Sequence, residues 1–334
     1  MALAPLTDGH GRVHTTLRVG LTERCNLRCV YCMPAAGVPV TPTARMLTAD
    51  EIVRLVRVLA AAGVDRVRLT GGEPLARRDA VEIAARVARQ PGVRTLALTT
   101  NALLLEDRLA ELAASVTHLT VSLDTLRADR FKAITRRPGL DRVLGAIGAA
   151  QRAGYAIGTE RPLKVNVVVL RDVNDDEAVD FAAWAAREAL EVRFIEWMPF
   201  GGNAWERRQL VPMAETRARI EDALGPLRAL GDGPHATART FTRPGWRGRV
   251  GFVASMSAPF CAGCNRLRIT ADGALKVCLF GNREVSLRDA LREGIADDEV
   301  LVRVRAALAG KAAAHAGVDG LAERENRPMI TIGG

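Results

Sequence analysis

Short β-type runs alternate with helical stretches through the first two hundred residues of the chain. The stretch 47–63 illustrates the helices: Thr48 and Glu51 have the spacing of a capping box, and Gly63 follows as a stop signal. Six such β/α units predict a parallel sheet with outer helices, either a doubly wound sheet or an incomplete (β/α) barrel. The predicted strands cover 14–22, 64–70, 93–100, 118–124, 163–170 and 191–198, and the other helices lie near 79–90, 104–114, 140–153 and 176–189.

The alternation stops near residues 198–210, and a different pattern follows. A stretch rich in Gly, Pro and Arg at 231–252 favours hairpins. We therefore expect two units, a core over 1–210 and a C-terminal extension over 211–334. Within the extension we expect helices near 212–224, 286–293 and 297–310, followed by a polar tail that ends in RPMITIGG.

Composition is that of an ordinary globular protein, with 48% hydrophobic and 25% charged residues in a chain of 334. The net charge of +9 fits either a basic surface or an anionic partner, such as nucleic acid or a phosphorylated small molecule. The start of the chain lacks the pattern of a signal peptide, and no apolar run has the length of a membrane span. We expect a cytoplasmic protein, in which clustered cysteines bind metal or do redox work.

All six cysteines fall into two triplets with different spacings. Each triplet stops one ligand short of the four that close a structural zinc site, although His10, His14 and His235 leave zinc open as an alternative. A [4Fe–4S] cluster with three thiolates would keep one iron open for a small molecule, so the triplets favour two such clusters. The proposed ligands are Cys25, Cys29 and Cys32 for the first cluster and Cys261, Cys264 and Cys278 for the second.

Cations recur at alternate positions of the predicted strands, so each pair lies on one face. Arg66 and Arg68 form one such pair, and Arg266 and Arg268 form another. Solvated strand faces would explain any single pair. Several cations inside a covered α/β layer require anionic partners, and a triphosphate would suit them.

The motif CNLRCVYC (25–32) resembles the CxxxCxxC signature of the radical SAM superfamily, and TGGEP (70–74) resembles its glycine-rich element. From about residue 13 to the last residue, the second triplet and the terminal GG extend the resemblance to the GTP 3′,8-cyclase family of molybdenum cofactor biosynthesis. This resemblance implies an incomplete (β/α)6 barrel with a C-terminal extension that carries a second iron–sulfur cluster. It also implies two [4Fe–4S] clusters and S-adenosyl-L-methionine (SAM) as cofactors.

The resemblance further implies a reaction and its site residues. A 5′-deoxyadenosyl radical would take hydrogen from C3′ of GTP, and C3′ would then bond to C8 to give (8S)-3′,8-cyclo-7,8-dihydroguanosine 5′-triphosphate. Arg66 and Arg193 are weaker candidates for triphosphate contacts, and Gly333 and Gly334 would act in the active site. The implied SAM contacts are Tyr31, Gly72, Ser122 and Met198, and the implied GTP contacts are Arg18, Arg68, Thr99, Lys164, Arg266, Leu267 and Arg268.

The expected partners are GTP, an external electron donor, the downstream cyclic pyranopterin monophosphate synthase and a second copy in a homodimer, with neither membrane nor nucleic acid. Two rival readings stay open at this stage. One is a peptide-modifying radical SAM enzyme with an auxiliary cluster. The other is a non-catalytic iron–sulfur or zinc module that binds nucleic acid through its basic charge.

Overall fold

A computed structural model describes residues 3–323 and 326–333, and these residues form one sheet of twelve strands. The strand order is β12-β11-β10-β1-β2-β3-β4-β5-β6-β9-β8-β7. The central six strands are parallel and stand side by side in chain order. They are β1 (Thr16–Gly20), β2 (Arg66–Thr70), β3 (Thr95–Thr100), β4 (His118–Ser122), β5 (Leu163–Val169) and β6 (Glu191–Glu196).

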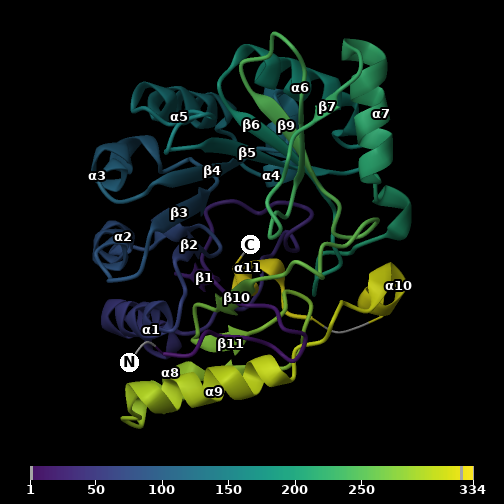
Figure 1. Cartoon of the computed structure of the whole chain (residues 1–334). Helices are drawn as coiled ribbons and strands as arrows, with labels where there is room; N and C mark the ends of the chain where they lie inside the picture. Colours follow the sequence, from purple (N-terminus) through teal and green to yellow (C-terminus); the bar gives the residue numbers. More distant parts are fainter. Residues whose placement is uncertain (1–2, 324–325, 334) are drawn as a thin grey trace.

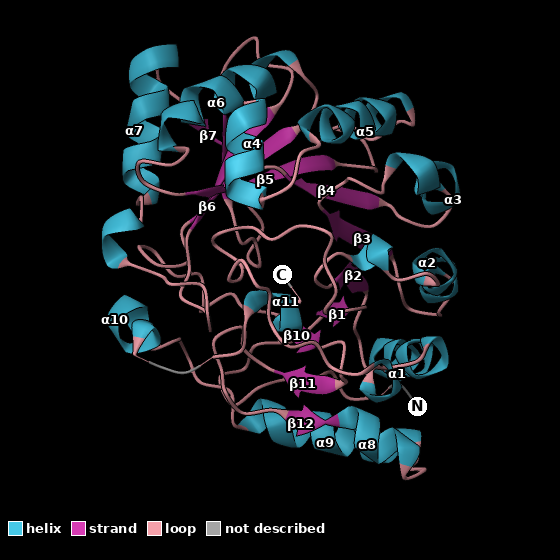
Figure 2. Cartoon of the chain, turned by 180° about the vertical axis from the view of Figure 1, so that it is seen from behind, coloured by secondary structure: helices cyan, strands magenta, loops and turns pink. Residues whose placement is uncertain are grey.

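These six strands confirm the predicted strands, each within a few residues of its expected bounds. A doubly wound sheet would reverse its strand order part-way, and this order does not reverse. The strands follow an arc with the helices along its outer side (Figure 2). The outer helices are α1 (Ala49–Ala61), α2 (Ala80–Ala88), α3 (Leu109–Ala113), α4 (Ala128–Thr135), α5 (Leu140–Arg152) and α6 (Ala178–Arg187).

The local sequence explains why these helices form where they do. The capping box of α1 is present: the Thr48 hydroxyl accepts from the Glu51 amide at 3.2 Å, and the Glu51 carboxylate accepts from the Thr48 amide at 2.8 Å. Helix α4 was missed from the sequence because no side chain caps its N-terminus and Arg136 ends it in the left-handed conformation. Helix α3 is shorter than predicted because a 3₁₀ turn over Glu106–Arg108 precedes it.

The C-terminal part extends the same sheet at both edges. β10 (Arg266–Ile269) pairs parallel with β1, and β9 (Arg249–Val253) pairs parallel with β6. The hairpin expected from 231–252 is confirmed by the antiparallel pairing of β8 (Arg239–Thr242) with β9. The remaining strands are β7 (Arg228–Ala229), β11 (Ala274–Lys276) and β12 (Val285–Ser286), and the helices are α7 (Met213–Leu224), α8 (Leu287–Arg292), α9 (Asp297–Ala309), α10 (Gly317–Ala322) and α11 (Met329–Ile332).

Two hydrophobic clusters support this arrangement. The larger one fills the layer between the sheet and its outer helices. The smaller one joins Phe200, Met256, Phe280, Leu321 and Ile332 on the inner side of the C-terminal part. Its last member belongs to α11, so the predicted polar tail is instead a short buried helix inside the arc (Figure 1). No helix in the described parts of the chain is both long and apolar enough to cross a membrane.

Candidate active site

The first cysteine triplet lies on the loop that follows β1. The amides of Cys32 and Met33 both donate to the Cys29 carbonyl, at 3.0 and 3.1 Å, so the loop turns back on itself. The Leu27 amide lies 3.4 Å from the Cys25 sulfur. All three thiols are partly buried and none forms a disulfide, so three free sulfur ligands are presented together.

The groups near this first triplet are the carboxylates of Glu73 and Asp124 and the guanidinium of Arg28, which donates to the Cys25 carbonyl at 2.6 Å. Burial, together with the negative charge of Glu73, raises the pKa of Cys25 to about 11. Burial and the charges of Cys25 and Asp124 raise the pKa of Cys32 to about 12. These thiols therefore need a bound metal to become thiolates near neutral pH.

The glycine-rich turn after β2 lies directly against the cysteine loop. The amides of Gly72 and Glu73 donate to the carbonyls of Thr22 and Arg24, at 2.7 and 2.8 Å. A Cβ on Gly72 would lie 2.6 Å from the Arg24 carbonyl oxygen, so only glycine fits there. The close approach of two backbones explains the glycine independently of any ligand.

Glu73 is the buried centre of this turn. Its carboxylate accepts from the Thr100 hydroxyl at 2.7 Å and from the amides of Leu75 and Asn101, at 3.0 and 2.7 Å. Burial nevertheless raises the pKa of Glu73 to about 7. The Asn101 side chain reaches back to the Cys25 sulfur at 3.9 Å, so Glu73 and Asn101 connect the ends of β2 and β3 to the triplet.

The structure brings Tyr31 to the same region through partners that the sequence did not indicate. Its hydroxyl donates to the Asp124 carboxylate at 2.8 Å. Its carbonyl accepts from the Asn203 amide at 3.1 Å, and Asn203 also donates to the Met198 carbonyl at 2.9 Å. Ser122 ends β4 beside Asn166 on β5. Tyr31 and Met198 are therefore linked through Asn203.

The second triplet is assembled by the β10–β11 hairpin. Cys261 and Cys264 lie on the loop before β10, where the Cys264 amide donates to the Cys261 carbonyl at 3.0 Å. Cys278 follows β11, and the antiparallel pairing of the two strands brings it back to the other two. All three cysteines line one cavity, together with Met198 from the end of β6. They form no disulfide, so this triplet too presents three free sulfur ligands.

Cations surround this second triplet. Lys311, which the sequence analysis missed, is only 5% exposed. Its ammonium group lies 3.3 Å from the Cys264 sulfur and 2.8 Å from the His14 ring nitrogen. Burial alone would raise the pKa of Cys264, but the charges of Arg266 and Lys311 lower it to about 7. Lys311 lies just after the end of α9, 47 residues after Cys264. The sequence alone therefore did not indicate that the two residues meet.

The strand register lines up three arginines across neighbouring strands. Arg68, Arg18 and Arg268 occupy matching positions on β2, β1 and β10. We call these three residues the arginine row. Two residues earlier on the same strands, Arg66 and Arg266 lie on either side of Thr16. Neighbouring strands lie about 4.8 Å apart, so the row concentrates positive charge on one face.

The charges of this row are poorly compensated by protein groups. Desolvation and neighbouring arginines lower the pKa of Arg68 and of Arg268 to about 10. Burial and the charge of Arg193 lower the pKa of Lys164 to about 7. In the described part of the chain, the side chains of Arg18, Lys164 and Arg266 have no hydrogen-bond or ion-pair partner. An anionic ligand would supply the missing negative charge.

Two buried oxygen atoms in the same cavity also lack partners among the described residues. They are Oδ1 of Asn166 and the hydroxyl of Ser255, and both residues line the cavity of the second triplet. Buried polar atoms in proteins are usually hydrogen-bonded. These atoms are therefore suited to contact a polar ligand.

The other predicted contacts differ in how the structure uses them. Thr99 accepts a hydrogen bond from Arg68 at 2.9 Å, so it orients that guanidinium. Arg193 lines the cavity but is paired with Glu191, and Arg66 is exposed at the start of β2. Leu267 is fully buried in the main core on the opposite face of β10 from its arginine neighbours. Its side chain does not line the cavity, so any ligand contact there would use its backbone.

The C-terminal tail reaches the arginine row. The Gly333 carbonyl accepts from the Arg268 guanidinium at 2.6 Å. Gly333 has φ of +83°, and a Cβ there would lie 2.7 Å from the Thr70 hydroxyl. Both features require glycine. The prediction for Gly334 lies outside the described residues.

Comparison with known families divides the chain in two. Residues 19–185 match the Radical SAM superfamily, and residues 190–317 match Molybdenum Cofactor Synthesis C. The mitochondrial GTP 3′,8-cyclase of Arabidopsis thaliana is 49% identical over 331 residues, which are 98% of this chain and 83% of that protein. The chain belongs to the GTP 3′,8-cyclase family of radical SAM proteins.

Further members of this family agree. The GTP 3′,8-cyclase of Rhodopirellula baltica is 40% identical over 98% of this chain and 92% of its own length. Molybdenum cofactor biosynthesis protein 1 of Mus musculus is 49% identical over 98% of this chain. That match covers only 51% of the mouse protein, so the chain spans about half the length of this relative.

Solved structures support the radical SAM fold. Streptococcus suis SuiB bound to S-adenosylmethionine superposes with a TM-score of 0.61 over 87% of this chain and 69% of SuiB, at 14% identity. The anSMEcpe protein with bound AdoMet and a peptide gives 0.50 over 87% and 82%, at 12% identity. At these identities the likeness concerns the fold alone.

The residues present fit the iron–sulfur chemistry of the family. Each triplet offers three free thiols, and the glycine turn leaves its backbone close to the first one. Across residues 3–323 and 326–333, no three His, Cys, Asp or Glu side chains are arranged around a single ion. A cubane cluster takes one thiolate on each iron, and therefore has ligands spread more widely than those of one ion.

Proposed function

We propose that this chain converts GTP into (8S)-3′,8-cyclo-7,8-dihydroguanosine 5′-triphosphate, the first step of molybdenum cofactor biosynthesis. The observation that carries the proposal is one cavity in which a cysteine triplet and unpaired arginines face each other. A triphosphate satisfies those arginines, and the cysteines beside them provide for a cluster near the base. The names of the relatives supply the same substrate.

A cluster on the first triplet, with SAM bound to its open iron, would supply the radical that takes hydrogen from C3′. The Gly71–Gly72 turn and Tyr31 would hold SAM against that triplet, since both lie on its rim. Ser122 ends β4 and Met198 follows β6, with β5 between these two strands, and both residues would contact the same molecule. The residues of the chain would thus bind SAM and orient it, and holding the reacting atoms in the right geometry lowers the barrier to reaction.

The triphosphate would lie across the arginine row and its neighbours. Arg18 and Arg266 have unused donors, and Arg268 has donors beyond the one that Gly333 occupies. Lys164 would add a compact charge at the side of the cavity. Arg68, fixed by Thr99 and by Thr120 at 3.0 Å, would present its guanidinium in one orientation. A second [4Fe–4S] cluster on Cys261, Cys264 and Cys278 would bind the guanine.

The proposal also covers the type of barrel, the domain bounds, the partners and the compartment. The arc of β1 to β6 corresponds to an incomplete (β/α)6 barrel, with residues 1–210 as the radical SAM core and 211–334 as the extension. The product would pass to a cyclic pyranopterin monophosphate synthase, an external donor would supply electrons, and a homodimer is the expected assembly. The cytoplasm remains the expected compartment, although the plant relative is described as mitochondrial.

Anaerobic reconstitution with iron and sulfide tests this function. The reconstituted protein is incubated with reductant, SAM and each nucleoside triphosphate in turn. We expect about eight irons per chain, four for each cluster, and 5′-deoxyadenosine together with a cyclised product only when GTP is present. Tight zinc without 5′-deoxyadenosine would instead favour a non-catalytic module, and turnover of a peptide would favour the peptide-modifying alternative.

A further inference from the structure

The C-terminal tail is fixed in the cavity at its far end, where Gly333 meets Arg268. Helix α11 itself has only four residues, fewer than a stable isolated helix requires. Its Ile332 is 1% exposed and packs in the smaller hydrophobic cluster with Phe200 and Phe280. The start of the tail needs a separate contact, because the contacts of Gly333 and Ile332 do not fix where the tail enters the cavity.

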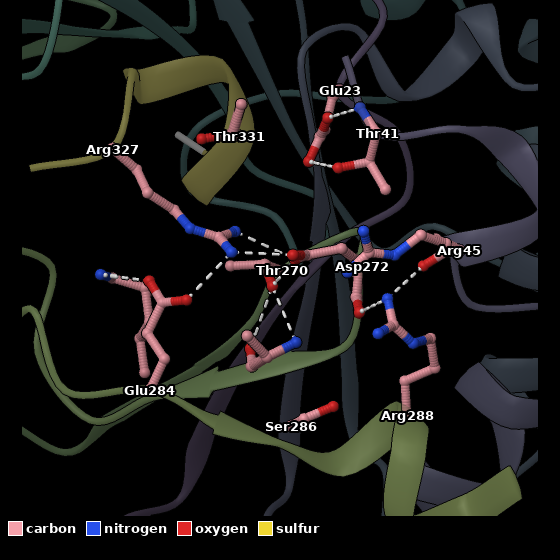
Figure 3. A network of polar contacts seen from close by, with 12 residues as sticks. Glu23, Thr41, Arg45, Thr270, Asp272, Glu284, Ser286, Arg288, Arg327 and Thr331 are labelled. Atoms are coloured by element: carbon pink, nitrogen blue, oxygen red, sulfur yellow. Dashed lines mark hydrogen bonds and ion pairs between the residues drawn. The ribbon is translucent and has the colours of Figure 1, made fainter. Parts of the chain in front are cut away.

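Arg327 provides that attachment. Its guanidinium donates to both carboxylate oxygens of Asp272, at 3.0 and 2.7 Å, and lies 3.0 Å from a Glu284 oxygen (Figure 3). The guanidinium side chain is 30% exposed and its two partners are 16% and 20% exposed, so the contact is partly shielded from water. A two-pronged arginine–carboxylate pair in that setting is stronger and more directional than an exposed ion pair.

Both carboxylates belong to the region that carries the second triplet. Asp272 lies in the turn between β10 and β11, where its carboxylate also accepts from the Thr270 hydroxyl at 2.5 Å and its carbonyl accepts from Arg288 at 3.0 Å. Glu284 also accepts from Lys276 of β11 at 3.0 Å, and Lys276 donates to the Gly281 carbonyl at 2.5 Å. Arg327 therefore fastens the tail to the hairpin that presents two arginines and Cys278 to the cavity.

On its other side, the tail packs closely against an uncharged residue, Gly201. A Cβ on Gly201 would lie 2.1 Å from the Asn326 carbonyl oxygen. Gly201 lies on the loop after Met198, so the tail enters between that loop and the β10–β11 hairpin. The Arg327 contact fixes the tail in this narrow entrance.

We infer that Arg327 is a positioning residue, which seats the C-terminal tail against the arginine row by fastening it to Asp272 and Glu284. The inference deepens the proposed function, because it assigns the residue that orders a segment placed in the reaction site. Arg327 touches neither triplet itself. It acts through the position of Gly333.

The test compares Arg327→Met with Arg327→Lys and with the control Arg303→Met. Methionine keeps the apolar stem and removes the donors, whereas lysine keeps the charge but not the two-pronged contact. Arg303 pairs with Glu299 on the outer helix α9, away from the tail, so its loss removes an ion pair of another kind. Asp272→Asn serves as a second variant, because it keeps the shape of the turn and removes one charge.

Amide hydrogen exchange in the full chain gives the first readout. The amides of Thr331 and Gly333 donate to the carbonyls of Pro328 and Met329, at 3.0 and 3.2 Å. We expect their exchange to accelerate about tenfold in Arg327→Met, less in Arg327→Lys, and not at all in Arg303→Met. Unchanged exchange in both Arg327→Met and Asp272→Asn would overturn the inference.

Turnover gives the second readout, in the reconstituted protein. We expect kcat for GTP to fall about tenfold in Arg327→Met, while iron content and the Kd for GTP stay within about twofold. A loosened tail with unchanged kcat would also overturn the positioning role. If the wild-type chain does not cyclise GTP, the proposed function fails, and the exchange data still decide whether Arg327 seats the tail.

Discussion

The carboxylates Glu73 and Asp124 lie near the first cysteine triplet together with the cation Arg28, whereas arginines and a buried lysine lie near the second. Around the first, burial and the charges of Glu73 and Asp124 hold the thiol pKa values far above neutrality. Around the second, Arg266 and Lys311 bring the pKa of Cys264 to about 7. Cys264 therefore loses its proton near neutral pH without metal, whereas Cys25 and Cys32 keep theirs until metal binds.

This difference separates two kinds of task. Under the proposed function, the carboxylates and backbone carbonyls near the first triplet would accept hydrogen bonds from the ammonium group of a zwitterionic cofactor. The second is surrounded by unpaired donors that suit an anion. Under the proposed function, the electrostatic surroundings, rather than the spacing of the cysteines, would distinguish the cofactor site at the first triplet from the substrate site at the second.

Removing one ligand from each triplet should break the comparison most strongly. We expect Cys32→Ala and Cys264→Ala each to abolish cyclisation and to retain about half of the iron. Cys32→Ala should also lose the spectral response of the remaining cluster to SAM, whereas Cys264→Ala should keep it and lose the response to GTP. Iron analysis and electron paramagnetic resonance distinguish these outcomes.

If both variants lose the same spectral response, the two triplets do not bind SAM and GTP separately. If Cys32→Ala responds to SAM as the wild type does, the first triplet is not the SAM site. The Arg303→Met variant again serves as a control for general damage.

Deleting Gly333 and Gly334 tests whether the C-terminal tail acts together with the arginines near the second triplet. We expect cyclisation to be abolished while the iron content stays near normal, because the deletion removes the Gly333 contact with Arg268 and leaves all six cysteines in place. The milder Gly333→Ala should lower kcat by about tenfold or more, since it combines a left-handed φ with a Cβ 2.7 Å from the Thr70 hydroxyl. Full activity in the truncated protein would remove the tail from the mechanism.

Thiol reactivity in metal-free protein should sharpen the comparison without any turnover. The thiolate reacts with iodoacetamide and the thiol does not, so the rate rises with pH through the pKa. Cys264 should reach half of its maximal rate near pH 7, whereas Cys25 should still accelerate at pH 10. At pH 7.5 the thiolate fractions should differ by about a thousandfold, and the lower nucleophilicity of the low-pKa thiolate should reduce the difference in rate to about fiftyfold. Mass spectrometry of each cysteine peptide measures both rates.

Lys311 gives the smallest and most local test. We expect Lys311→Met to slow alkylation of Cys264 at pH 7 by about tenfold, because the buried ammonium lies 3.3 Å from that sulfur. Lys311→Arg should keep most of the wild-type rate, and Cys25 should be unaffected in both variants. An unchanged Cys264 rate in Lys311→Met would assign the low pKa of this thiol to Arg266 alone.

The sequence was informative wherever the signal was local. Alternating β and α segments predicted the six parallel strands, and Thr48 with Glu51 predicted a cap that is present. The cysteines and the glycine turn were found by spacing. These features depend on neighbours within a few residues, which a single sequence displays directly.

The rest depended on contacts between distant segments. Lys311, Asp124 and Arg327 were not among the predicted site residues, and each matters because contacts between distant segments bring it to the site. Leu267 was predicted as a contact beside two arginines, yet the alternation of β10 turns its side chain into the core. The pairing of β10 with β1 across about 250 residues could not be read from hydrophobic pattern alone.

That pairing has a consequence for how the chain folds as it is made. During synthesis β1 and β6 emerge with one open edge each, because their partners β10 and β9 lie later in the chain, at Arg266–Ile269 and Arg249–Val253. Open edges of parallel strands invite pairing with other chains. Until these two strands emerge, the nascent chain exposes two edges that other chains could pair with, and a fragment that stops at residue 210 would keep both edges exposed.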